Sequence, residues 1–127
     1  MLLFLGLGMV SVTAEQIRKR LGLTSADISD EDVLAFRDEA TVFLSEEIGR
    51  SLNAESCAEA EANAIRNLAA IYCYCKVTGG SAVGLDFSIG DLRFSPDAGK
   101  QLEFLKEQAE RFIARQKRFG ISLQEGP

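Results

Sequence analysis

Apolar residues recur every three or four positions through four stretches of the chain, which is the spacing of one face of an α-helix. The first stretch begins at Thr13, where Gln16 three positions later completes the pattern of a capping box. It runs to Arg20, and Gly22 supplies a left-handed stop. This helix is too short to be stable alone, so we expect it to dock on another element.

The second predicted helix begins at Ser29, because a serine N-cap followed by three acidic residues is a strong helix start. It runs to about Arg50, and Gly49 marks its end. Most of its acidic residues fall on the face opposite the apolar stripe. That stripe consists of Val33, Phe36, Ala40, Phe43, Leu44 and Ile48.

The third predicted helix runs from Ala54 to about Thr78, with Asn53 as its N-cap, and stops at the glycine pair 79–80. Apolar residues lie on two of its faces, and several of those in its first half are alanines. A helix that is apolar on two sides is covered on two sides, so we expect this segment to be the central helix of the domain.

Residues 83–95 change to a pattern in which apolar and polar residues alternate. Two alternating runs on either side of Gly90 and Asp91 predict a β-hairpin with a two-residue turn. An isolated hairpin is marginal in water, so the bundle or a neighbouring subunit must cover its apolar residues. These residues are Leu85, Phe87, Ile89, Leu92 and Phe94.

The fourth predicted helix begins with Ser95 as N-cap and Pro96 as its first residue. It runs to about Phe119 and ends at Gly120. Phe104 lies off its apolar stripe. The stripe consists of Leu102, Leu105, Ala109, Phe112 and Phe119, with Ile113 widening it.

The sequence therefore predicts a mainly α fold: a four-helix bundle-like domain with a small β-hairpin between the last two helices. One domain covers residues 13–120, between an apolar arm (1–12) and a flexible tail (121–127). The arm packs on a neighbour, or residues 1–8 are an artefact and Met9 is the true start. The expected core includes Phe36, Phe43, Ile65, Leu68, Tyr72, Leu105 and Phe112.

Composition narrows the possible functions. The 127 residues suit one domain, and a net charge of −5 argues against binding free DNA or RNA, since phosphate contacts need a basic surface. The chain has no histidine, which removes the commonest general base and the commonest zinc ligand. No motif combines a nucleophile with a base, so we expect no catalytic residue, no metal and no cofactor, and no enzyme activity.

The three cysteines bear on the redox environment of the protein, and its apolar runs bear on membrane association. Cys57, Cys73 and Cys75 are an odd number in a chain without other ligand residues nearby, so we expect buried, reduced thiols rather than a disulfide framework. No apolar run reaches the roughly 20 residues that span a bilayer, so no membrane partner is expected.

Charge is unevenly distributed along the chain. Residues 1–63 carry a net charge of −7, and residues 64–127 carry +2. Two interpretations remain open: cations near a helix C-terminus simply solvate its face, or the acidic and basic ends let copies associate head to tail into a ring. The densest basic run consists of Arg111, Arg115, Lys117 and Arg118.

Three segments resemble the head–tail connector (head-completion or adaptor) family of tailed double-stranded DNA bacteriophages and proviruses. Residues 12–33 (VTAEQIRKRLGLTSADISDEDV) are similar to the family's opening helix and the acidic cap after it. Residues 64–80 (AIRNLAAIYCYCKVTGG) resemble its alanine-rich third helix, and residues 88–95 (SIGDLRFS) resemble the extended segment before its last helix. The apolar arm and the compact segment 81–95 depart from the family pattern.

The resemblance implies structural work in virion assembly. Such proteins form a ring of about twelve copies, a closed cyclic assembly, under the portal. The expected partners are other copies, the portal protein and a tail-completion protein, with DNA only as passing cargo, in the virion or in the host cytoplasm during assembly. The residues expected to contact the neighbour or the portal are Leu85, Phe87, Ile89, Leu92, Phe94, Phe104, Arg111, Arg115, Lys117 and Arg118.

Two other functions compete with this interpretation. The first is a small cytosolic helical module that regulates a partner and forms a dimer. The second is an enzyme that uses a buried thiol or carboxylate, which requires a depressed pKa at one of the cysteines.

Overall fold

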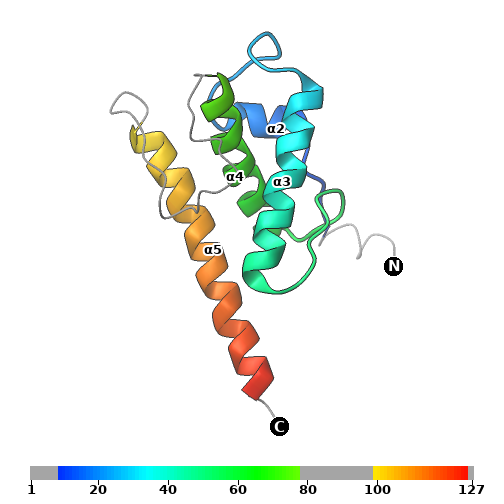
Figure 1. Cartoon of the computed structure of the whole chain (residues 1–127), viewed down its shortest axis with the longest axis vertical. Coiled ribbons are helices and arrows are strands. Elements are labelled where there is room, and N and C mark those ends of the chain that lie inside the picture. The colour runs from blue at the N-terminus through cyan, green and yellow to red at the C-terminus, as the bar shows by residue number, and fades with distance from the viewer. Residues whose placement is uncertain (1–8, 78–98, 126–127) are drawn as a thin grey trace.

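The computed structural model describes residues 9–77 and 99–125, with side chains through residue 118 in the last helix. Its helices are α2 (Ala14–Lys19), α3 (Asp30–Ile48), α4 (Glu59–Val77) and α5 (Gly99–Glu125). Figure 1 shows α4 between α3 and α5, with α2 across one end of α3 and α4. The mainly α prediction is confirmed, whereas the predicted hairpin and the predicted cap at Ser95 lie outside the described residues.

The first helix, α2, begins as its sequence predicts. The Thr13 side chain accepts a hydrogen bond from the backbone N–H of Gln16, and the Gln16 side chain accepts one from the N–H of Thr13, which completes the capping box. Six residues cannot hold a helix alone, and Ile17 is fully buried against α3 and α4. Docking of this short helix on its neighbours is therefore confirmed.

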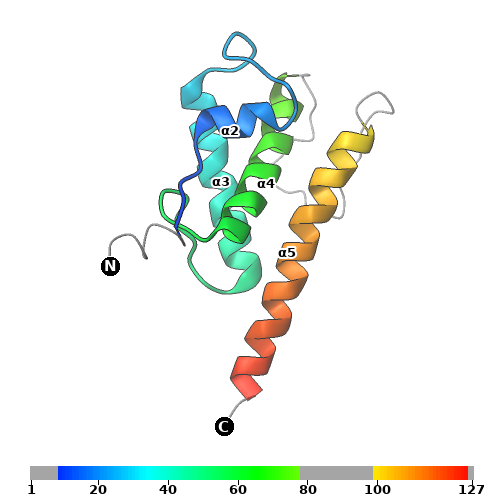
Figure 2. The ribbon, with the colours of Figure 1, turned by 180° about the vertical axis from the view of Figure 1, so that it is seen from behind.

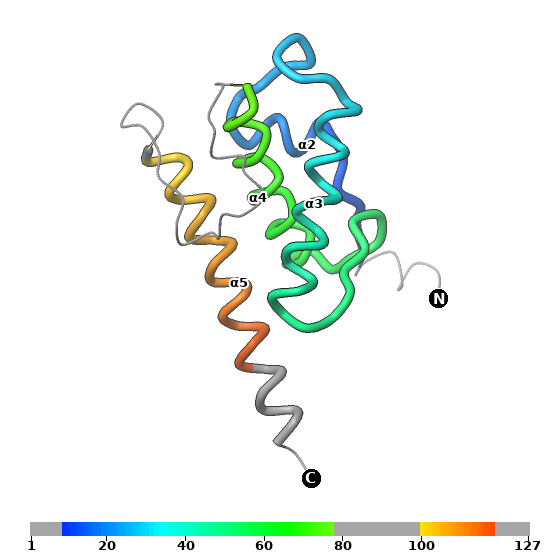
Figure 3. Tube along the Cα trace, in the orientation of Figure 1, coloured from blue at the N-terminus to red at the C-terminus, as the bar shows by residue number. Residues whose placement is uncertain are grey.

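A short extended segment before α2 pairs with the connection between α3 and α4. Val10 and Cys57 exchange backbone hydrogen bonds of 2.8 and 2.9 Å as an antiparallel bridge. The N–H of Val12 donates to the carbonyl of Ala54 at 2.8 Å. The two segments run side by side in Figure 3, so residues 10–12 form part of the folded domain.

This pairing corrects the predicted start of α4, which begins at Glu59 rather than Ala54. Backbone groups that pair with residues 10–12 cannot also close helical hydrogen bonds, so residues 54–58 stay outside the helix. Asn53 does not cap a helix. Its side chain accepts from the N–H of Glu55 at 2.9 Å within a turn.

The ends of α3 confirm their predicted caps. The Ser29 side chain accepts from the N–H of Asp32 at 3.2 Å, and Gly49 ends the helix in the left-handed conformation with φ of +81°. A Cβ at Gly49 would meet no atom within 4 Å, so the backbone conformation, and not space, favours glycine there.

The core lies on both sides of α4, as its two apolar faces predict. Ile65, Leu68 and Ile71 are fully buried, and the Tyr72 ring lies 6.1 Å from the Phe36 ring on α3. Alanines at this helix let its neighbours approach closely. Of the seven residues expected in the core, six are buried and Phe43 is only half-buried.

The last helix, α5, packs against α4 through its apolar stripe, with Leu102, Leu105, Ala109 and Phe112 buried. It continues to Glu125, so the predicted end at Gly120 is wrong. A glycine weakens a helix but ends it only where the backbone turns left-handed, and residue 120 keeps the helical conformation. Figure 2 shows α5 running past the end of the other helices.

Candidate functional site

A cluster of buried and half-buried polar side chains joins α2 to α4. Arg20, at the end of α2, donates from Nη1 to Oδ1 of Asn67 at 2.6 Å and from Nη2 to Oδ1 of Asn63 at 3.0 Å. Asn67 is only 3% exposed. Burial, together with the neighbouring charge of Arg66, lowers the pKa of Arg20 from its usual value.

Arg66 forms the second half of this cluster from within α4. Its Nη1 donates to Oδ1 of Asn63 at 2.8 Å and to Oε2 of Glu59 at 3.2 Å. Its Nε donates to Oε1 of Gln16 at 2.9 Å, the same atom that closes the capping box of α2. Two arginines, two asparagines and the start of α2 therefore form one connected network.

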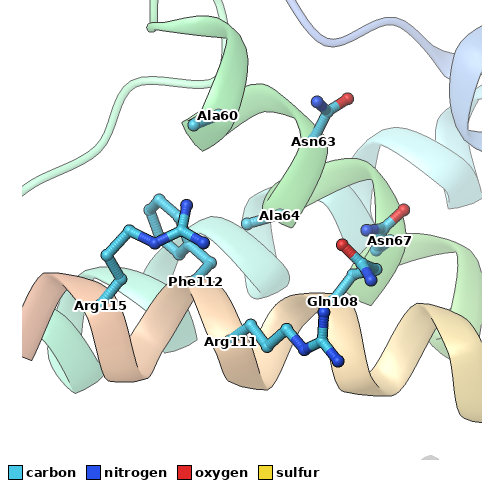
Figure 4. Close-up of a pocket in the computed structure, with 8 residues that line it drawn as sticks. All are labelled: Ala60, Asn63, Ala64, Asn67, Gln108, Arg111, Phe112 and Arg115. Carbon is cyan, nitrogen blue, oxygen red and sulfur yellow. The ribbon is translucent and has the colours of Figure 1, made fainter.

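On the α5 side of this network lies a pocket of about 180 Å³. Each helix contributes four residues at positions i, i+3, i+4 and i+7, which is one face of a helix. Figure 4 shows the Arg115 side chain turned toward α4 and the Gln108 side chain beside Asn67. The lining residues are Ala60, Asn63, Ala64 and Asn67 of α4, and Gln108, Arg111, Phe112 and Arg115 of α5.

The pocket carries positive charge in an acidic protein. Arg111 and Arg115 line it, and no acidic residue is among the described lining residues. Neither guanidinium forms an ion pair with another residue in the described ranges 9–77 and 99–118. The two cations are therefore available to a ligand or a partner.

The predicted interface residues on α5 separate into two groups. Phe104, Arg111, Arg115 and Arg118 follow one another at intervals of seven, four and three residues, so they share one side of the helix. All four are exposed, and Phe104 retains 56% of its surface. We call them the α5 stripe.

Lys117 does not belong to the α5 stripe. Its Nζ lies 3.4 Å from Oε1 of Glu47 at the end of α3, so it ties the two helices together within the chain. Arg50 makes a similar tie, because it donates to Glu61 of α4 at 2.7 Å and to Gln116 of α5 at 2.6 Å. The hairpin residues Leu85, Phe87, Ile89, Leu92 and Phe94 lie outside the described residues.

The environment of the three thiols disfavours the thiolate form that a nucleophile needs. Cys57, Cys73 and Cys75 are buried, and burial raises the pKa of all three. The pKa of Cys73 rises to about 12. A catalytic thiol needs a lowered pKa, so this geometry gives no support to thiol chemistry.

Within the described ranges, no three histidine, cysteine, aspartate or glutamate side chains gather as metal ligands would. Among the same residues, none of the helices has the length and apolar character needed to cross a bilayer.

Neither the polar network nor the pocket follows from the predictions made on sequence. Arg20 and Arg66 enter those predictions only as charges, and Asn63 and Asn67 do not enter them. A signal was present, because Asn63 and Asn67 stand four residues apart and so share one face of the predicted central helix. Polar residues on a buried face need partners, which points to a network. The pairing with α2 could not be read from spacing.

Comparison with known proteins does not assign the chain to a family. No family model matches the chain, and neither a curated protein nor a solved structure resembles it significantly.

Proposed function

We propose that this protein is a structural component of a tailed-phage or provirus virion. Copies of the chain form a ring that joins the portal of the capsid to the tail and extends the DNA channel. The observation that carries this proposal is the α5 stripe, in which an exposed phenylalanine and three exposed arginines line one side of a long helix. Aromatic and arginine side chains are the residues that most often anchor protein interfaces.

The surface that complements the α5 stripe is α3 of a neighbouring copy. Its 19 residues include seven acidic residues and one arginine, a net charge of −6. Most of these acidic side chains are exposed, among them Asp38, Glu39 and Glu46. The segment of α5 from 111 to 118 has four basic residues and no acidic one.

The two charged surfaces lie on different elements, so a contact between them joins unlike faces of two copies. Such a heterologous contact propagates from copy to copy and closes into a ring when the rotation permits. Val42 of α3, 57% exposed, adds an apolar residue to the acidic surface. An isologous dimer would instead need one patch that complements itself.

Light scattering over a series of protein concentrations tests the proposal. The wild-type mass should rise in steps towards a ring that negative-stain microscopy can image, either with the protein alone or after addition of a portal protein. Phe104→Ser and Arg118→Glu should keep the chain monomeric, because they remove the apolar anchor and reverse one charge of the stripe. Lys19→Glu makes the same change of charge at an exposed position of α2 and should leave assembly unchanged.

Two results would overturn the proposal. A constant mass of two subunits at all concentrations would favour the dimeric regulatory module. Sequencing the DNA beside the gene gives an independent test: genes for a portal, a large terminase and tail proteins are expected, and a metabolic or stress operon would contradict a role in virion assembly.

A further inference from the structure

We propose that the pocket between α4 and α5 binds an oxyanion, namely a phosphate or carboxylate group. The ring described above requires no such ligand, so this inference goes beyond it. The argument depends on the direction of the pocket's hydrogen-bond donors, on its charge and on its size.

Asn67 presents a donor to the pocket because Arg20 fixes the orientation of its amide. A guanidinium only donates, so the atoms of Asn63 and Asn67 that meet Arg20 and Arg66 must be the amide oxygens. The NH₂ group of each asparagine then faces away from the arginines. In Figure 4 the amide nitrogen of Asn67 lies on the side of Gln108. A buried, pre-oriented N–H donor is what an anion site requires.

Charge favours the same ligand. Arg111 and Arg115 line the pocket from α5, and Arg20 and Arg66 lie behind the asparagines. The acidic residue of the network, Glu59, pairs with Arg66, and its side chain is 64% exposed. No acidic side chain is among the described residues that line the pocket.

The pocket has room for such a group. Ala60 and Ala64 are small, and Phe112, buried at 6% exposure, closes one wall. A volume of about 180 Å³ is many times the ~10–15 Å³ that one water needs. Arg115 and Arg111 stand one helical turn apart, so two guanidinium groups can approach one oxyanion from the same helix.

Nuclear magnetic resonance provides the test. Wild-type protein is titrated with inorganic phosphate and separately with acetate, while sodium chloride is adjusted to hold ionic strength constant. The side-chain NH₂ signals of Asn63 and Asn67 and the Nε signal of Arg115 should shift along saturable curves. Equal, non-saturating shifts with chloride, phosphate and acetate would overturn the proposal.

Three variants localise the effect. Arg115→Gln should weaken binding about tenfold, because a charge-assisted contact is lost. Asn67→Asp keeps an acceptor for Arg20 but puts a negative charge in the pocket, so it should abolish binding without loss of thermal stability. Arg118→Gln, one helical turn beyond the pocket, is the control and should bind like wild type. A site that survives Asn67→Asp in a folded protein would refute the assignment.

The same titration distinguishes a free anion from a carboxylate of another copy. If a glutamate or aspartate of a second copy fills the pocket, phosphate should lower the associated mass in light scattering. If the ligand is free, and Phe104 and Arg118 carry the contact between copies, phosphate should saturate the pocket without changing that mass. Failure of both titrations contradicts the anion site and leaves the ring proposal standing, because the two have separate readouts.

Discussion

Arg20 and Asn67 meet across 47 positions of sequence, with 2.6 Å between the guanidinium Nη1 and the amide Oδ1. Their hydrogen bond holds the end of α2 against the middle of α4. It also turns the amide nitrogen of Asn67 away from α2. One contact therefore serves both the packing of the shortest helix and the polar lining of the α4–α5 pocket.

Replacing Arg20 should destabilise the fold. Arg20→Leu leaves the Oδ1 atom of the buried Asn67 without its partner, and an unpaired buried acceptor costs about 1–3 kcal/mol. Urea denaturation followed by circular dichroism measures the loss. Lys19→Leu removes the same charge from an exposed neighbouring position and is the matched control. Equal stability of the two variants would contradict a structural role for the network.

Replacing Gly49 tests the left-handed end of α3. Gly49→Ala forces a Cβ into a conformation with φ of +81°, which should lower the free energy of unfolding by about 1 kcal/mol. No atom lies within 4 Å of the added carbon, so packing should contribute nothing. Asparagine tolerates this left-handed conformation better than alanine does. If backbone strain is the cause of the loss, thermal melts should show Gly49→Asn to be more stable than Gly49→Ala.

Neighbouring residues on α5 should behave in opposite ways. Leu105 is 2% exposed, so Leu105→Ala should cost about 2–5 kcal/mol through lost packing and a cavity. Phe104 is 56% exposed, so Phe104→Ala should change the stability of the monomer little. Chemical denaturation at low protein concentration compares them. A large loss from Phe104→Ala would show that this ring is part of the core.

The buried thiol of Cys73 predicts a loss of stability at high pH. In the unfolded chain the thiol loses its proton near pH 9, whereas in the folded protein its pKa is about 12. Between these values the folded state binds more protons than the unfolded state, so stability should fall as pH rises from 9 towards 12. Denaturation midpoints at several pH values measure the slope.

A variant tests whether Cys73 causes this loss of stability at high pH. Cys73→Ala should flatten the fall above pH 9, even though the smaller side chain lowers stability at neutral pH. An unchanged slope would mean that other groups cause the alkaline loss. Tyr72 contributes in the same direction, because burial raises the pKa of its hydroxyl as well.

Thiol labelling gives a separate prediction. Because all three cysteines are buried and their pKa values are raised, alkylation of the native protein at neutral pH should be slow. Addition of denaturant should allow three labels per chain, counted by mass spectrometry. Rapid labelling of any cysteine in the native state would reopen the thiol-enzyme interpretation.

Local signals were enough to predict most of the fold. The caps at Thr13, Ser29 and Gly49 depend on hydrogen bonds and backbone angles within a few residues, and the structure confirms each one. The burial of α4 on two sides follows from its composition, which fits a helix between two others. The predicted position of Phe104 off the core face of α5 is confirmed by its exposure.

The errors arose where distant segments decide local structure. Residues 54–58 have a helical pattern, but pairing with residues 10–12 keeps them out of α4. Lys117 belonged to the basic run in sequence, yet its contact with Glu47 separates it from the α5 stripe. The pocket arises from the antiparallel meeting of two helix faces, and no spacing within either helix predicts that meeting.

The backbone pairing of Val10 with Cys57 fixes the residue at which the central helix α4 begins. Residues 54–58 have a sequence that is suited to a helix, and the bridge holds them in another conformation. Without the bridge, the same residues could join α4 and lengthen it by more than one turn. The length of the innermost helix is thus set by strand-like contacts made more than forty residues away.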